Sequence, residues 1–171
     1  MSGSLGLTCT PMTAADAPVL IAYDGSDAAR RAIRETAELF GSRRALVVTV
    51  WEPGLAYDAA ALPTAGLEMA PVPVDVEGAQ EVAEGLHERA RRTAQEGAEL
   101  AQSVGLQAKG LAVADEVHIA DAIVGVARKR GVPAIVVGSR GLTGLRARLE
   151  GSTSNAVLRH APCPVVVVHD D

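Results

Sequence analysis

The sequence predicts an α/β fold: a single doubly wound domain in which helices cover both faces of a five-stranded parallel sheet. First, short continuous apolar runs alternate along the chain with amphipathic segments of helical period, which is typical of buried parallel strands joined by helices. Second, apolar residues make up 48% of the 171 residues but aromatic residues only 2%, so the core must be aliphatic.

The charge balance and the apolar pattern exclude several classes of function. The chain has 16 basic and 21 acidic residues, a net charge of −5, which gives no overall attraction for nucleic acid or an anionic membrane. The few aromatic side chains argue against a base-stacking platform. No apolar run approaches the ~18 residues that cross a bilayer. We therefore expect neither nucleic acid nor a membrane as a partner.

The ends of the chain and its cysteines indicate a cytoplasmic protein. Residues 1–17 are rich in Ser, Gly, Thr and Ala and predict a flexible N-terminal leader before a domain at 18–171. The first basic residue is Arg30, so the charged start of a secretion signal is missing. Cys9 and Cys163 have neither metal-binding nor CxxC spacing, which favours a reducing compartment and, for Cys163, a packing role over a nucleophilic one.

The first elements form a strand, a helix and a second strand. The apolar run at 19–23 ends at Asp24-Gly25-Ser26, and Ser26 is a suitable N-cap. Apolar residues then recur at helical spacing until Gly41, which ends the helix. The next apolar run, 45–51, is the second strand, and its uninterrupted apolar character is typical of a sheet covered on both faces.

Residues 52–78 interrupt this alternation. Prolines and glycines recur throughout the segment and argue against a regular element in it. A stretch of this length inside a compact domain is usually a mobile or functional loop. We predict a mobile loop here, and the alternative is a disordered insertion without function.

The second half of the chain continues the α/β alternation. The expected elements are a helix at 80–104, a weakly alternating edge strand at 106–114, a helix from Ile119 that closes at Gly131, a strand at 133–137, a helix capped by 152–155 that runs to about Arg159, and a strand at 165–168.

Two of the strand ends carry residues suited to an anionic ligand. In open parallel sheets, ligands bind beyond the carboxyl ends of the strands. The first strand ends at Asp24, and the fourth leads into a glycine-rich loop at 138–144, followed by Gly151-Ser152-Thr153. Glycines and a helix N-terminus offer backbone N–H groups to phosphate, and residues 139–160 hold four arginines against one glutamate. Alternatively, the glycines only shape a β-to-α loop and Ser152 only caps a helix.

The spacing of these glycines resembles a known signature. Gly138-x-x-Gly141, nine residues, then Gly151-Ser152 match the G-2x-G-9x-G-[S/T] pattern of the ATP-binding class of universal stress proteins. The opening run 19–26 and the closing run 163–168 are also similar to that family, and the similarity covers about 18–169. The resemblance implies a strand order of 3-2-1-4-5, which places the first and fourth strands side by side.

The resemblance also implies which residues bind ATP, or another adenine nucleotide, on the nucleoside side. It implies that Ala22 lines the adenine pocket and that Val50 offers backbone groups to adenine. Val137 and Gly138 border the nucleoside. Asp24 faces the ribose or a phosphate-bound Mg²⁺, and its alternative role is to cap the first helix.

On the phosphate side, the resemblance implies a cradle of backbone N–H and hydroxyl groups. The residues that would form it are Gly141, Gly151, Ser152 and Thr153. Arg140 occupies a variable position of the signature and is a further candidate contact.

The last strand is the expected dimer interface. The resemblance implies a homodimer joined through this strand, at Val165, Val166, Val167 and Val168. An apolar edge strand without a charged residue invites pairing with another strand, which agrees with this expectation. Burial under the neighbouring helix is the competing explanation of these valines.

The sequence favours a binding protein over an enzyme. No Gly-Lys-[Ser/Thr] of a Walker A motif occurs, and the HxGH, SGGxDS and GxSxG patterns are missing. The four histidines are scattered at spacings that do not suit a metal. We expect a nucleotide-dependent regulatory protein of the stress response. The alternatives are a slow ATPase or phosphate-transferring enzyme, and a dimeric interaction module without a nucleotide.

Overall fold

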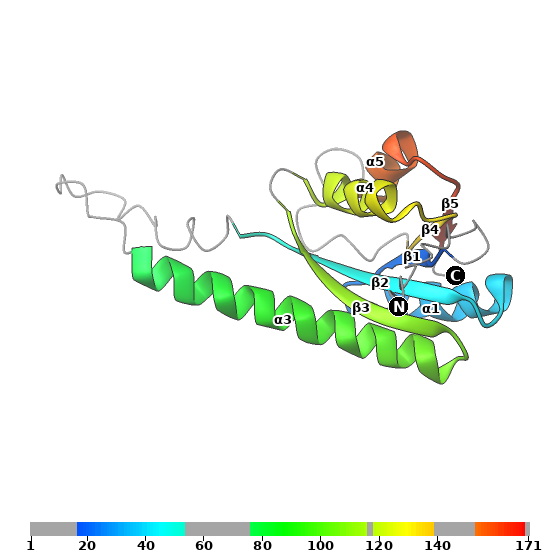
Figure 1. Cartoon of the computed structure of the whole chain (residues 1–171), viewed down its shortest axis with the longest axis horizontal. Helices are drawn as coiled ribbons and strands as arrows, with labels where there is room; N and C mark the ends of the chain where they lie inside the picture. Colours follow the sequence, from blue (N-terminus) through cyan, green and yellow to red (C-terminus); the bar gives the residue numbers. More distant parts are fainter. Residues whose placement is uncertain (1–16, 54–75, 116–117, 139–152, 170–171) are drawn as a thin grey trace, which may run out of the picture.

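The computed structural model describes residues 17–53, 76–115, 118–138 and 153–169. Within them the strands form one sheet of order β3-β2-β1-β4-β5, and every pairing is parallel (Figure 1). The strands are β1 Val19–Ala22, β2 Arg44–Trp51, β3 Gln107–Ala114, β4 Ile135–Gly138 and β5 Val165–Val168. The α/β fold class and the strand order implied by the resemblance are therefore confirmed.

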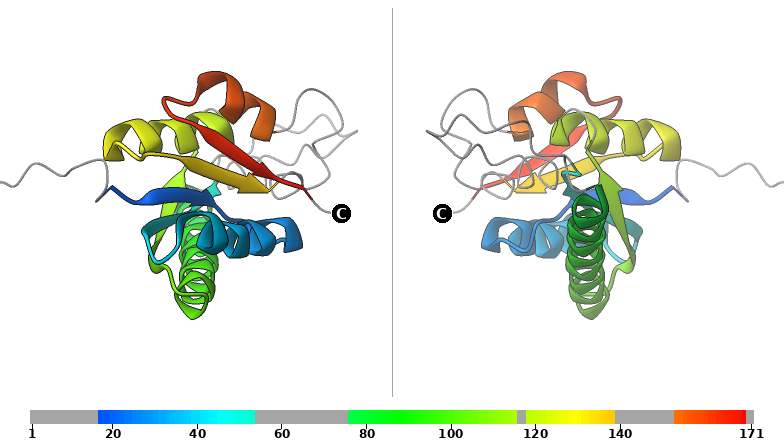
Figure 2. Two further views of the ribbon diagram at one scale, coloured as in Figure 1. Left: turned by 90° about the vertical axis from the view of Figure 1, so that its right-hand side faces the viewer. Right: turned by 90° about the vertical axis from the view of Figure 1, so that its left-hand side faces the viewer.

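Four described helices cover the two faces of the sheet in pairs. They are α1 Asp27–Phe40, α3 Val76–Ser103, α4 Ile119–Arg130 and α5 Thr153–His160. Figure 2 shows α1 and α3 on one face and α4 and α5 on the other. None of these helices, in the described part of the chain, has both the length and the apolarity that a membrane crossing requires.

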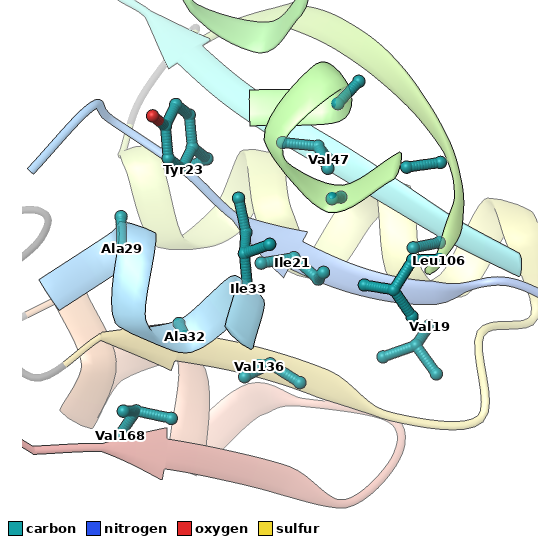
Figure 3. Close-up of a cluster of buried hydrophobic side chains, with 14 of the residues drawn as sticks. Val19, Ile21, Tyr23, Ala29, Ala32, Ile33, Val47, Leu106, Val136 and Val168 are labelled. Carbon is teal, nitrogen blue, oxygen red and sulfur yellow. The ribbon is translucent and has the colours of Figure 1, made fainter. Parts of the chain in front are cut away.

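The sheet has a hydrophobic core on each face because its strands are apolar on both sides. Along β1, Val19 and Ile21 contribute to the cluster under α1 and α3, which Figure 3 shows. The intervening Leu20 contributes to the second cluster, under α4 and α5. Leu20 and Ile21 are both 0% exposed. This two-sided burial explains the continuous apolar runs from which the strands were predicted.

Helix α1 begins and ends where its capping residues predict. The Ala29 N–H donates to Ser26 Oγ at 3.2 Å, so Ser26 is the N-cap. Gly41 ends the helix at a φ of 65°, a conformation that favours glycine, and its N–H donates to the Ala37 carbonyl at 2.9 Å. Both boundary predictions for this helix are confirmed.

Helix α3 packs closely on the sheet through small residues. A Cβ added at Gly97 would lie 2.6 Å from Tyr23 Cδ1 and 2.8 Å from Val47 Cγ1. On the sheet side, a Cβ added at Gly110 of β3 would lie 2.6 Å from the Ala94 carbonyl oxygen. The N-terminal half of α3 projects past the sheet (Figure 1). Two glycines thus permit the close approach of this helix to β2 and β3.

The described structure corrects two segment boundaries. Helix α3 begins at Val76, so residues 76–78 are helical and do not belong to the loop predicted at 52–78. Gly78 is tolerated there because one glycine costs only about 0.5–1 kcal/mol relative to alanine, a small penalty in a helix of 28 residues. Ala17, assigned to the N-terminal leader, is buried at 4% exposure. Residues 1–16 and 54–75 lie outside the described part of the chain, so the rest of both predictions stays untested.

The packing of α3 predicts opposite effects for the same substitution at two of its positions. Gly97→Ala is expected to lower the free energy of unfolding by about 1–2 kcal/mol, because its methyl group overlaps Tyr23 and Val47. Gly85→Ala is the matched control: a Cβ there has no neighbour within 4 Å, and alanine favours the helix by about 0.5–1 kcal/mol. Urea unfolding of both variants measures the difference. Equal effects would contradict this account of the helix–sheet contact.

Candidate functional site

The C-terminal ends of β1 and β4 lie next to each other in the centre of the sheet. Leu20 pairs with Ile135 and Ile21 with Val136. Because the strands are parallel, Asp24 and Gly138 follow at the same edge of the sheet. The sheet order reverses between these two strands, which is where ligands bind in open α/β sheets.

The turn after β1 presents an exposed carboxylate at this edge. Asp24 Oδ1 accepts a hydrogen bond from the Ser26 N–H at 2.9 Å. Gly25 has a φ of 83°, a conformation that other residues rarely adopt. Its carbonyl accepts a hydrogen bond from Arg30 Nε at 3.2 Å. Asp24 therefore shapes the turn through one oxygen, and no described residue donates to Oδ2.

The end of β2 holds the chain as it leaves β1. The Tyr23 N–H donates to the Val48 carbonyl at 2.8 Å, and the Thr49 hydroxyl donates to the Tyr23 carbonyl at 2.8 Å. Thr49 is 7% exposed and was not among the predicted site residues. The signal for it is a single hydroxyl within an aliphatic strand, since a buried hydroxyl needs a hydrogen-bond partner.

The end of β4 is fixed from both faces of the sheet. The Ser154 hydroxyl of α5 donates to the Gly138 carbonyl at 3.2 Å, and this bond is buried. On the opposite face, a Cβ added at Gly138 would lie 2.8 Å from the Ala28 backbone carbon. Sequence reasoning placed Ser154 only within a helix-capping group. The first residue of α5, Thr153, is half-buried, so the start of α5 lies beside the end of β4.

The remaining predicted site residues divide into buried and undescribed ones. Ala22 and Val137 are buried at 4% and 0% exposure in the cluster under α4 and α5, and half-buried Val50 packs against it. These three side chains are therefore part of the core, and a ligand would meet mainly their backbone. Four further predicted residues lie outside the described part of the chain: Arg140, Gly141, Gly151 and Ser152.

Asp24 is the one carboxylate among the predicted site residues that the structure describes. In the described residues there is no group of three or more His, Cys, Asp or Glu side chains that could hold a metal ion. Asp24 itself supplies one carboxylate. That donor set fits a Mg²⁺ ion only where phosphate oxygens and water supply the other ligands, which is the usual arrangement with nucleotides.

Cys163 and two arginines of α3 lie away from this edge. Cys163 is half-buried and packs against the cluster under α4 and α5, and burial raises the pKa of its thiol. The contact with the core agrees with the packing role predicted for Cys163. Arg91 and Arg92 both pair with Glu88, and all three are more than half exposed, as expected of a solvated helix face.

The phenol of Tyr23, beneath the β1 turn, predicts an alkaline limit to stability. Burial raises its pKa, the charge of Arg30 lowers it, and the charges of Glu96 and Asp24 raise it. Because the folded pKa is raised, the associated stability is complete below the unfolded pKa of about 10 and is lost as the pH rises through the folded pKa. We expect the free energy of unfolding of the wild type to fall above about pH 10. The free energy of unfolding of Tyr23→Phe is expected to fall less over the same range. If the free energy of unfolding decreases with pH by the same amount in both proteins, this account of Tyr23 is wrong.

Comparison with known proteins identifies relatives of the chain. The model of the universal stress protein family matches residues 17–169. Universal stress protein YxiE of Bacillus subtilis is 29% identical over 161 residues, covering 88% of this chain and 97% of the relative. A universal stress protein of Thermus aquaticus is 33% identical over 157 residues, covering 88% of this chain and 96% of the relative.

Solved structures share the fold. The protein MJ0577 superposes with a TM-score of 0.68 at 21% identity, covering 92% of this chain and 98% of that one. A universal stress protein in complex with cAMP has a TM-score of 0.59 at 21% identity, covering 92% and 99% of the two chains. An Arabidopsis thaliana family member with AMP bound has a TM-score of 0.54 at 16% identity, covering 91% and 92%.

Proposed function

The chain belongs to the universal stress protein family, and from that premise we propose that it is a regulatory protein that binds ATP, or another adenine nucleotide, beyond the ends of β1 and β4. The observation that carries the proposal is the adjacency of these two strands, which brings Asp24 and the start of the G-2x-G-9x-G-[S/T] signature, Gly138, to one edge. In the proposed complex Asp24 lies toward the ribose or the metal, and the signature residues lie toward the phosphates.

The fixed backbone at this edge supports the proposal. Thr49 holds the β1 exit and Ser154 holds the β4 exit, each by a buried hydrogen bond. A rigid edge lowers the ordering cost of binding, because its backbone groups are in place before the ligand arrives. Related solved structures with cAMP and AMP support an adenine nucleotide as the ligand class.

The arrangement supports phosphate binding at the start of α5. Gly151 and Ser152 directly precede Thr153, the first residue of this helix. The N–H groups of a first helical turn lack acceptors within the helix, and the helix dipole favours an anion there. Three or four hydrogen bonds to charged oxygens, each worth about 1.5–3 kcal/mol, are enough for micromolar affinity after the costs of ordering.

The proposal assigns this chain no catalytic step. Bound Mg²⁺ would neutralise phosphate charge, with Asp24 as its protein ligand. Phosphoryl transfer additionally needs a positioned base and a Lys or Arg on the transferred group. The sequence offers no Walker A lysine for that purpose. We therefore propose that nucleotide occupancy acts by changing the state of a loop or of a dimer, in the cytoplasm.

The outer edge of β5 is the proposed dimer contact. β5 is the last strand in the sheet order, so one of its edges has no neighbouring strand in the described residues. Three of its four valines are only half-buried, and Val168 is buried at 8% exposure. Pairing of this edge with a second copy would cover these apolar side chains. Sedimentation equilibrium tests this contact. The wild type is expected to be dimeric and Val166→Lys monomeric.

Isothermal titration of the protein with MgATP tests the proposed site. We expect micromolar binding, and Asp24→Asn is expected to weaken it about tenfold when Mg²⁺ is present, because the variant loses one charged metal ligand. The effect is expected to be smaller in EDTA. The matched control is Asp27→Asn, the same change at an exposed residue in the first turn of α1.

Three results decide the outcome. Binding by the wild type with selective weakening in Asp24→Asn supports the site. Equal weakening in both variants would mean that the charge acts only at long range. The third result is that the wild type gives no heat of binding with MgATP and its native mass spectrum shows no bound nucleotide. That result would favour an interaction module without a ligand.

A further inference from the structure

The outer edge of β3 presents unpaired backbone groups. The Gln107 N–H donates to the Arg43 carbonyl and the Asp115 N–H to the Trp51 carbonyl, so odd-numbered residues of β3 pair with β2. In a parallel ladder the even-numbered residues then direct their N–H and C=O groups to the other side. Of these, the Ala108 carbonyl accepts from Gln102 Nε2. The backbone groups of Gly110 and Ala112 have no partner in the described residues.

A groove runs between this edge and α3, on the opposite side of the sheet from β5. It has a volume of about 680 Å³. Its floor is formed by Gly110, Leu111 and Ala112 of β3, and the charged residues of its α3 wall are Glu88, Arg91 and Arg92. Figure 1 shows the strand and the helix lying side by side. The groove therefore lies next to the unpaired backbone groups of the β3 edge.

We propose that this groove binds an extended peptide segment of another protein that carries carboxylate side chains, added to the sheet beside β3. The peptide backbone pairs with Gly110 and Ala112, which is the β-augmentation mode of peptide recognition. Its alternate side chains face α3, where carboxylates meet Arg91 and Arg92. The inference concerns the outer edge of the sheet at β3 and does not depend on the proposed nucleotide site.

Charge favours an acidic peptide over a second copy of this chain. Arg91 and Arg92 share one partner, Glu88, at 3.7 and 3.6 Å, and their side chains are 65% and 73% exposed. Exposed ion pairs of this kind contribute little to stability. The two arginines can therefore readily exchange Glu88 for a peptide carboxylate. A second copy of the chain would bring the same two arginines to the groove, and this like charge opposes self-pairing at the β3 edge.

Fluorescence anisotropy with a designed probe tests the proposal on the full chain. The probe is a fluorescein-labelled nonapeptide of alternating valine and glutamate, and its control carries lysine in place of glutamate. We expect the glutamate probe alone to bind, with an affinity that falls as salt is raised. Arg91→Glu is expected to raise the Kd about tenfold. Arg34→Glu, the same charge change on the exposed side of α1, is the control and is expected to leave it unchanged.

Two further measurements test the backbone pairing. Ala112→Pro removes one outward N–H and leaves the hydrogen bonds from β3 to β2 intact. It is expected to lower the affinity for the probe about threefold to tenfold. Its circular dichroism spectrum is expected to be unchanged. Probes N-methylated either on all valine or on all glutamate amides each have one blocked edge, and we expect at least one of them to lose about tenfold in affinity.

Several results would overturn the proposal. One is that both N-methylated probes bind as tightly as the parent. Another is that the lysine probe binds as well as the glutamate probe. A third is that no probe binds and Arg91→Glu changes the sedimentation of the protein, because a second copy of the chain would then occupy the groove.

Discussion

Gly138→Val is expected to lower the free energy of unfolding by about 3 kcal/mol. A Cβ at this position would lie 2.8 Å from the Ala28 carbonyl carbon and 2.9 Å from its oxygen. These are backbone atoms in the first turn of α1, so relief requires the whole helix to move. β4 is also tied to α5 through Ser154, which prevents the strand from shifting the other way.

The same substitution is expected to abolish detectable nucleotide binding. Displacing the start of α1 also displaces Asp24 and the turn that it shapes, because Ser26 links the two by its N–H bond to Asp24. Gly125→Val on α4 is the control, since a Cβ there meets nothing within 4 Å. Urea unfolding and titration with MgATP measure both effects. A Gly138→Val protein as stable as the control would contradict the packing described for this glycine.

Gly151→Asp is expected to weaken binding of MgATP at least about hundredfold with little effect on stability. The signature places this residue just before α5, where phosphate would approach backbone N–H groups. Two like charges about 4 Å apart near a protein surface repel by about 4 kcal/mol at an effective dielectric constant of 20. A carboxylate here would oppose the phosphates of a nucleotide bound at the proposed site.

Gly85→Asp is the matched control for this charge. It introduces the same side chain on α3, at a site where a Cβ has no neighbour within 4 Å. Isothermal titration of both variants, with the unfolding midpoint of each, separates repulsion from damage to the fold. If the two variants bind MgATP equally well, the signature glycine does not lie at the phosphates.

Sequence reasoning predicted the architecture because the signals in this chain are local and agree with one another. Ser26 and Gly41 set the bounds of α1 as expected, and the four valines of β5 coincide with the strand. The start of α3 was missed by four residues, because a single glycine costs a long helix too little to end it.

The tertiary contacts of the candidate site were less accessible from sequence. Thr49 and Ser154 hold the strand exits through bonds to carbonyls distant in the chain, and periodicity carries no information about such pairs. Gly138 was interpreted through the resemblance as a border of the nucleoside. The structure adds a packing requirement against Ala28, which depends on how α1 crosses β4.

Hydrogen exchange of the wild-type protein with and without MgATP tests the central claim most directly, because it reports where the ligand lies. The account predicts slower exchange of amides at the ends of β1 and β4 and in the first turn of α5, with β3 and the N-terminal half of α3 unchanged. Binding that leaves these three segments unprotected, or that protects the β3 edge in their place, would contradict it.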